Sequence, residues 1–255
     1  MSANETALAE RLGRRNLPIL CYHRVLAAPP PGGTSNIHVT REVFAAHLRQ
    51  LRRRGLATIT FADLAGERPV PKRPVILSFD DGYRDNYEHL LPLLDQYDAR
   101  AVIFALGDRN LRSNRWDEGS GMPQAPLMSD AELRACASSG RMEIGCHGLA
   151  HRHLRDLDDG ALEEELRAGK ASLEAVTGRP VISFAYPWGE WSRREREAVA
   201  RAGYLFGVAT DHGTTIAEDR YTLARRIVFP RTSGFGFYKK TSPWYRRYRR
   251  VLGRS

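Results

Sequence analysis

The chain has 255 residues, of which 42% are hydrophobic, and a formal net charge of +9 at pH 7. This length and apolar content suffice for one α/β domain with a full core, so no second domain is required. Residues 1–16 are polar and charged, and no stretch has the apolar length of a signal-peptide core or a membrane span. We therefore expect a cytoplasmic protein that is not exported by the usual route.

The three cysteines, Cys21, Cys136 and Cys146, are an odd number without the paired spacing of zinc-binding thiols. This usage is typical of reduced thiols in a cytoplasm rather than of a disulfide framework. Cys146 precedes a histidine, but a small buried residue is the favoured interpretation of it.

Short apolar segments alternate along the chain with segments of helical periodicity. Strands are predicted over residues 17–25, 56–59, 75–79, 101–106, 142–144, 182–184, 205–209 and 224–229. Helices are predicted over residues 40–53, 60–64, 86–97, 129–139, 158–176 and 193–202, and Ser129 with Glu132 forms a capping box. This alternation is what a barrel of strands and helices requires.

Two adjacent carboxylates, Asp80 and Asp81, follow the apolar run 75–79 and precede Gly82. Sites in α/β proteins are built at the carboxyl ends of strands, where loops converge on a rigid scaffold. A turn at Gly82 lets both side chains reach one cavity, where one carboxylate can bind a metal while the other handles a proton. Alternatively, one aspartate caps the following helix and the other is simply solvated.

His147 and His151 lie four residues apart after another predicted strand. This spacing places both imidazoles on one side of a turn, within reach of a single ion. Together with the aspartates, the pair indicates a His-His-Asp metal site. His153 is out of step with the pair and is interpreted as a neighbour.

Residues 107–128 form a longer connection than usual and include Trp116. The indole can contact a substrate or pin its own loop. At the other end of the chain, residues 237–255 combine basic side chains with aromatic rings. We expect this tail to contact an anionic membrane surface, although a solvated tail is an equal alternative and the same charges could bind nucleic acid, which is not expected here.

The segment Phe79-Asp-Asp-Gly82, with His147-Gly-Leu-Ala-His151 and Leu154, resembles the polysaccharide deacetylase family with the NodB-homology domain, also called carbohydrate esterase family four. The resemblance implies a single-domain deformed (β/α) barrel and a metal held by Asp81, His147 and His151, with Asp80 as catalytic base. Zn²⁺ is the expected ion, and Co²⁺, Ni²⁺ or Fe²⁺ also suit these ligands.

A third motif, Phe184-Ala-Tyr-Pro-Trp-Gly189, is similar to the family segment that supplies an oxyanion-binding N–H, so Tyr186, Pro187 and Trp188 are candidate oxyanion and substrate residues, together with Trp116. Ala185 replaces the arginine that normally orients the base. The Tyr-Pro-aromatic-Gly form resembles the poly-N-acetylglucosamine deacetylase branch. There an N-terminal Tyr-His-Arg strand replaces the late histidine motif, which implies His23 as general acid, with His212 as a weaker candidate.

The resemblance implies hydrolysis of an N-acetyl group from an amino sugar in a polysaccharide, oligosaccharide or lipid-linked glycan, with the catalytic domain at residues 17–236. Two rivals remain. A two-His, one-carboxylate site also serves Fe(II) oxygenases, but these have a different ligand spacing and strand pattern. A catalytically silent carbohydrate-binding protein on the same fold is favoured by the missing arginine and the missing late histidine motif, and opposed by the presence of Asp80.

Overall fold

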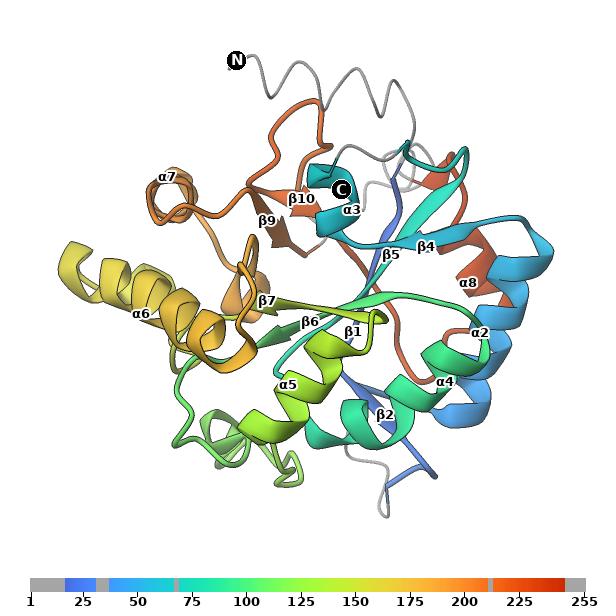
Figure 1. Ribbon diagram of the computed structural model, residues 1–255, viewed down its shortest axis with the longest axis horizontal. Helices are drawn as coiled ribbons and strands as arrows, with labels where there is room; N and C mark the ends of the chain where they lie inside the picture. Colours follow the sequence, from blue (N-terminus) through green and yellow to red (C-terminus); the bar gives the residue numbers. More distant parts are fainter. Residues whose placement is uncertain (1–16, 31–36, 67–68, 211–212, 246–255) are drawn as a thin grey trace.

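In the computed structural model, residues 17–30, 37–66, 69–210 and 213–245 are described. A nine-stranded sheet forms the centre, in the order β10-β9-β8-β7-β6-β5-β1-β11, and β4 pairs with β5 (Figure 1). The neighbouring strands run parallel. The strands are β1 (Ile19–Tyr22), β4 (Ala57–Ile59), β5 (Pro74–Phe79), β6 (Ala101–Ala105), β7 (Met142–Cys146), β8 (Ser183–Ala185), β9 (Phe206–Ala209), β10 (Leu223–Ala224) and β11 (Arg226–Ile227). A separate pair joins β2 (Arg24–Leu26) to β3 (His38–Thr40).

Helices surround these strands (Figure 1): α2 (Arg41–Arg53), α3 (Phe61–Ala65), α4 (Leu91–Gln96), α5 (Asp130–Ser138), α6 (Asp159–Thr177), α7 (Arg193–Arg201) and α8 (Gly234–Lys240). The capping box predicted from Ser129 and Glu132 is confirmed at the start of α5. The helix predicted over residues 86–97 instead begins with a π-helical turn, Asn86–Leu90, and continues as α4. No described helix is long and apolar enough to span a bilayer.

The predicted strand at residues 224–229 is wrong as a single element. The chain forms two short strands on either side of Arg225: β10 pairs with β9, whereas β11 pairs with β1 at the opposite edge of the sheet. The N–H of Arg225 donates to the carbonyl of Ala209 at 3.0 Å. The segment therefore joins the two sheet edges, and the predicted barrel is confirmed as a nearly closed ring of parallel strands with helices outside.

Two apolar clusters lie on the two faces of the strands, which explains the continuous apolar runs in the sequence. One cluster joins side chains such as Leu77 and Ile103 to the surrounding helices. The other joins Ile76, Val102 and Phe206 with residues of α3. Because each strand is covered on both faces, its carboxyl end is held rigidly.

His47 on α2 is buried between β1 and α8. Its Nδ1 lies 3.1 Å from the hydroxyl of Tyr22, and its ring stacks on Phe237 at a centroid distance of 3.9 Å. Burial lowers the pKa of His47 from 6.5 to about 4. Between these pH values the unfolded chain binds a proton at His47 that the folded chain does not. The free energy of unfolding is therefore unaffected by this group above pH 6.5 and declines as the pH falls to 4.

We expect this titration to remove about 3 kcal/mol from the free energy of unfolding by pH 4. Urea unfolding of the protein and of His47→Gln, measured from pH 7 to pH 4, tests the expectation. The variant is less stable at pH 7 but should have a smaller slope of stability against pH. An unchanged slope would assign the acid sensitivity to other groups.

Candidate active site

The polar residues singled out in the sequence come together at the carboxyl ends of adjacent strands. Asp80 and Asp81 follow β5, His147 follows β7, and His23 follows β1. Tyr22 pairs with Phe79, so His23 and Asp80 continue neighbouring strands at the same level. The parallel sheet thus assembles the site from distant parts of the chain.

Asp81, His147 and His151 form a buried group of three ligand types. The Oδ1 atom of Asp81 lies 3.4 Å from the Nε2 atom of each histidine. The Nδ1 atom of His147 is 2.8 Å from the carbonyl of Ala185. A hydrogen bond from Nδ1–H to this carbonyl directs Nε2 toward Asp81, the arrangement that orients metal-binding histidines.

The loop between the two histidines is held from behind by a buried carboxylate. The Oε1 atom of Glu165 on α6 accepts the N–H of Ala150 at 2.7 Å. A Cβ atom on Gly148, which has a φ of +86°, would lie 2.9 Å from the same oxygen. His151 itself adopts a φ of 59°. The tight loop turns this imidazole back toward Asp81.

These residues fit a divalent metal ion. The buried Oδ1 atom of Asp81 has no hydrogen-bond partner within the described residues, although two imidazoles lie beside it. Bonds of about 2.0–2.1 Å to a tetrahedral Zn²⁺ place neighbouring ligand atoms about 3.3 Å apart, close to the separations at Asp81. Burial opposes ionisation of this carboxyl, but the two imidazoles outweigh burial and hold the pKa of Asp81 well below its usual value. An anionic ligand is therefore available at neutral pH.

Asp80 has different partners, although it is the next residue. Both carboxylate oxygens accept hydrogen bonds from the guanidinium of Arg225, at 2.5 Å to Oδ1 and 2.7 Å to Oδ2. Both side chains are almost fully buried. Burial alone would raise the pKa of Asp80, but the charge of Arg225 and the nearby His147 lower it below its usual value. Asp80 is thus kept ionised and fixed in orientation.

Arg225 is the functional residue that the sequence prediction missed. Ala185 does replace the expected arginine, and its backbone carbonyl instead supports His147. The inference that Asp80 lacks an orienting arginine is wrong, because the closing segment of the barrel supplies one. The available signal was a pair of arginines, Arg225 and Arg226, at the start of a predicted strand that is otherwise apolar.

His23 lies between β1 and β2 and is partly buried. The side-chain amide of Asn86 donates to the His23 carbonyl at 3.0 Å. The neighbouring Asp85 carboxylate accepts from Arg24 Nε at 2.8 Å and from the Val25 N–H at 3.0 Å. The π-helical turn thus fixes the backbone that carries His23. The alternative acid, His212, lies outside the described residues, so the choice between these histidines stays a prediction.

Two tryptophans adjoin His151. The ring of Trp116 stacks on His151 at 4.5 Å, and that of Trp188 meets His151 edge-on at 4.9 Å. Trp188 also stacks on His153, which pairs with Glu190 at 3.2 Å. The Trp188 side chain is 44% exposed, so it offers an apolar face to solvent beside the proposed ligands.

Tyr186 and Pro187, which precede Trp188, have no backbone N–H available to bind an oxyanion. Tyr186 is buried, its hydroxyl donates to the Tyr221 carbonyl at 2.8 Å, and its N–H donates to the Val208 carbonyl at 3.2 Å. Pro187 has no N–H. Of the three residues predicted to bind the oxyanion, Trp188 is therefore the one whose backbone N–H is still a candidate for that role.

Comparisons with known proteins find similar sequences and similar folds. A family model for polysaccharide deacetylase matches residues 67–207. The curated protein "Putative polysaccharide deacetylase YxkH" of Bacillus subtilis is 26% identical over 226 residues, covering 87% of this chain and 74% of that protein. The fold is similar to the Streptococcus pyogenes deacetylase PplD in complex with acetate (TM-score 0.74, 23% identity, 89% of this chain and 98% of that chain). It is also similar to IcaB from Ammonifex degensii (TM-score 0.69, 22% identity, 89% and 97%). The family model spans more than half of the sequence, and the chain belongs to the polysaccharide deacetylase family, hydrolases that remove acetyl groups from polysaccharides.

Proposed function

We propose that the protein is a metal-dependent N-deacetylase of amino-sugar glycans. The observation that carries the proposal is the pairing of two adjacent buried carboxylates with different partners: Asp81 faces two imidazoles, and Asp80 is held by Arg225. Asp81, His147 and His151 would hold the ion, with Zn²⁺ the best match and Co²⁺, Ni²⁺ or Fe²⁺ as alternatives. When bound, such an ion polarises the acyl carbonyl and lowers the pKa of bound water to about 7.

The remaining residues handle protons and the developing charge. Asp80, ionised and aligned by Arg225, accepts the proton of the attacking water. The Trp188 N–H is the backbone donor proposed for the tetrahedral oxyanion. His23 then protonates the departing amine, and the products are acetate and a free amino sugar.

The rival function is a carbohydrate-binding protein that has lost catalysis. Its support came from the apparent loss of the arginine that orients the base and of the late histidine motif, and Arg225 removes the first of these. A binding site has no need of an ionised carboxylate held in one orientation beside the metal ligands. The geometry therefore favours an enzyme.

Acetate release from a panel of N-acetylglucosamine oligomers and lipid-linked amino sugars tests the proposal. We expect metal-loaded protein to release acetate, and Asp80→Asn to lower kcat by about 100-fold or more while the metal stays bound. Metal content measured on both proteins is the control. If no substrate yields acetate although the metal is bound, the silent-fold alternative replaces the enzyme.

Trp188 is proposed to stack on a sugar ring of the glycan. Replacing it by alanine removes an exposed apolar face and one edge-on contact with His151, whereas the stacking contact from Trp116 still holds that ring. KM should therefore rise by about 10-fold with little change in kcat. Trp116→Ala is the matched comparison, because that indole stacks on His151 and its loss should affect metal affinity as well. A change in kcat alone for Trp188→Ala would contradict a role in binding.

We also propose a peripheral position at the inner face of an anionic membrane. Residues 229–255 contain lysines and arginines but no acidic residue. Phe235 on α8 is 68% exposed, and Phe229, Tyr238 and Trp244 are also exposed. Tyr245, which the sequence suggested as a membrane contact, is instead buried with its ring 4.9 Å from the guanidinium of Arg226. Rings beside positive charge suit lipid headgroups.

Cosedimentation with phosphatidylserine vesicles tests this position. We expect binding that is lost in phosphatidylcholine vesicles and reduced by Phe235→Ser or by deletion of residues after Pro243. Trp188→Ala is the control for an exposed ring elsewhere. Binding that is unchanged by both C-terminal variants would exclude this surface.

A further inference from the structure

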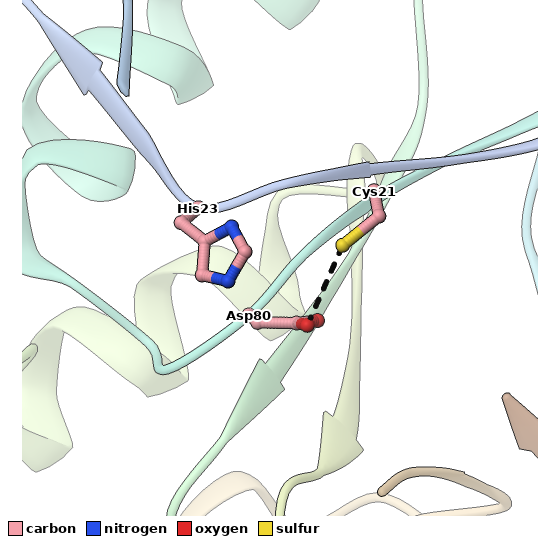
Figure 2. A group of neighbouring side chains, drawn as sticks. All are labelled: Cys21, His23 and Asp80. Atoms are coloured by element: carbon pink, nitrogen blue, oxygen red, sulfur yellow. Dashed lines mark hydrogen bonds between the residues drawn. The ribbon is translucent and has the colours of Figure 1, made fainter. Parts of the chain in front are cut away.

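A second group of metal-ligand types lies beside the first. Cys21, His23 and Asp80 each offer one ligand atom, and these atoms lie within 4.8 Å of one another. The Sγ atom of Cys21 is 3.6 Å from Oδ2 of Asp80. Figure 2 shows the three side chains converging, with the thiol and the imidazole directed toward the carboxylate.

The backbone explains why the three side chains meet. Cys21 and His23 are two residues apart on an extended segment, so their side chains leave the same side of it. Cys21 pairs with Ser78 on β5, and Asp80 lies two residues beyond Ser78. The Asp80 N–H also donates to the Tyr22 carbonyl at 3.0 Å, which holds the two strand ends in register. The group is therefore held by the sheet.

We propose that Cys21, His23 and Asp80 form a second binding site for Zn²⁺ and chemically similar ions, distinct from the Asp81-His147-His151 site. A sulfur, a nitrogen and an oxygen ligand suit Zn²⁺, Co²⁺ and Cd²⁺, whereas Mg²⁺ and Ca²⁺ prefer oxygen alone. On binding, the Cys21 S–H bond breaks, a sulfur–metal bond forms, and the proton is released to solvent.

Two features make this site weaker than the first. The guanidinium of Arg225, 2.7 Å from Asp80 Oδ2, repels a second cation. Cys21 is 1% exposed, and burial raises its thiol pKa well above the usual value, so binding must displace a firmly held proton. The negative charge of the resulting thiolate offsets the positive charge of Arg225. We therefore expect the site to fill only after the first equivalent of metal has bound.

Occupation of this site inhibits the enzyme. The ion would take the lone pairs of Asp80 and His23, which are the base and the acid of the proposed deacetylation. This consequence rests on the proposed function, whereas the binding site itself does not. Loss of both proton-transfer groups should lower acetate release by about 100-fold or more.

Titration of metal-free protein with Co²⁺ tests the site. A thiolate bound to Co²⁺ gives a near-ultraviolet charge-transfer band, and the Asp81-His147-His151 site contains no sulfur. We expect the band only beyond the first equivalent, in parallel with inhibition. Cys21→Ser should show neither the band nor the fall in acetate release between one and two equivalents. Cys136→Ala removes another buried thiol, whose Sγ is 3.8 Å from Met128 Sδ, and should keep both.

A wild-type measurement guards against misfolding of Cys21→Ser. Zinc X-ray absorption should show a sulfur ligand at about 2.3 Å with two equivalents of Zn²⁺ and none with one. Absence of the cobalt band at two equivalents, or a band that persists in well-folded Cys21→Ser, would overturn the proposal. Acetate release at one equivalent tests the proposed function separately. A protein with the band but without acetate release would retain the site and lose the deacetylase assignment.

Discussion

We expect Arg225→Ala both to lower kcat for deacetylation and to reduce the free energy of unfolding. Asp80 would keep its buried position but lose both hydrogen bonds from the guanidinium and its positive charge. Removing one partner of a buried ion pair costs about 3–5 kcal/mol in the free energy of unfolding. Loss of an aligned base should lower kcat by about 100-fold or more. Acetate release and urea unfolding measure the two effects.

Three further variants separate charge, alignment and folding. Arg225→Lys keeps the charge without the two-pronged contact, so it should recover stability better than kcat. Arg225→Ala combined with Asp80→Asn should be more stable than Arg225→Ala alone, because no unpaired charge remains, yet inactive. Arg226→Ala is the matched control, since that guanidinium donates to the Lys240 carbonyl and its loss should spare kcat. A normal kcat in Arg225→Ala would show that the base needs no orientation.

Asp81→Asn should remove the metal and with it all acetate release. The substitution replaces an anionic ligand by a neutral amide whose NH₂ group cannot bind a cation. Changes to groups that merely support metal ligands cost about 10–100-fold in affinity, so loss of a direct ligand should cost more. Metal content after dialysis, measured beside acetate release, checks the result. Treatment with a chelator should reproduce it in the unmodified protein.

Asp80→Asn serves as the internal control for this prediction, because it is the adjacent carboxylate and has different partners. It should retain the metal and lose turnover, whereas Asp81→Asn loses both. Activity restored to chelator-treated protein by one equivalent of Zn²⁺ would support the assigned ligands. If Asp81→Asn binds metal as tightly as the unmodified protein, the ion lies elsewhere.

The sequence predicted those features that depend on local patterns. Strand ends were visible at Asp80 and His147, and the capping residue Ser129 marked the start of α5. The role of Arg225 was not visible, because it depends on which distant strands the flanking residues join. The segment 224–229 reads as one strand, and only the meeting of β9 and β1 breaks it at the arginine. Pairing between sheet edges is a property of the whole barrel.

The place of Arg225 also ties the orientation of Asp80 to the closure of the ring. The proposed metal ligands lie between residues 81 and 151, so they are synthesised well before the segment that closes the ring. Until β10 and β11 join the sheet edges, Asp80 lacks the guanidinium, whereas the proposed metal ligands come from the ends of β5 and β7 and the loop that follows β7. Deacetylase activity would then require a complete ring. A chain that lacks the closing segment would bind metal without hydrolysing glycans.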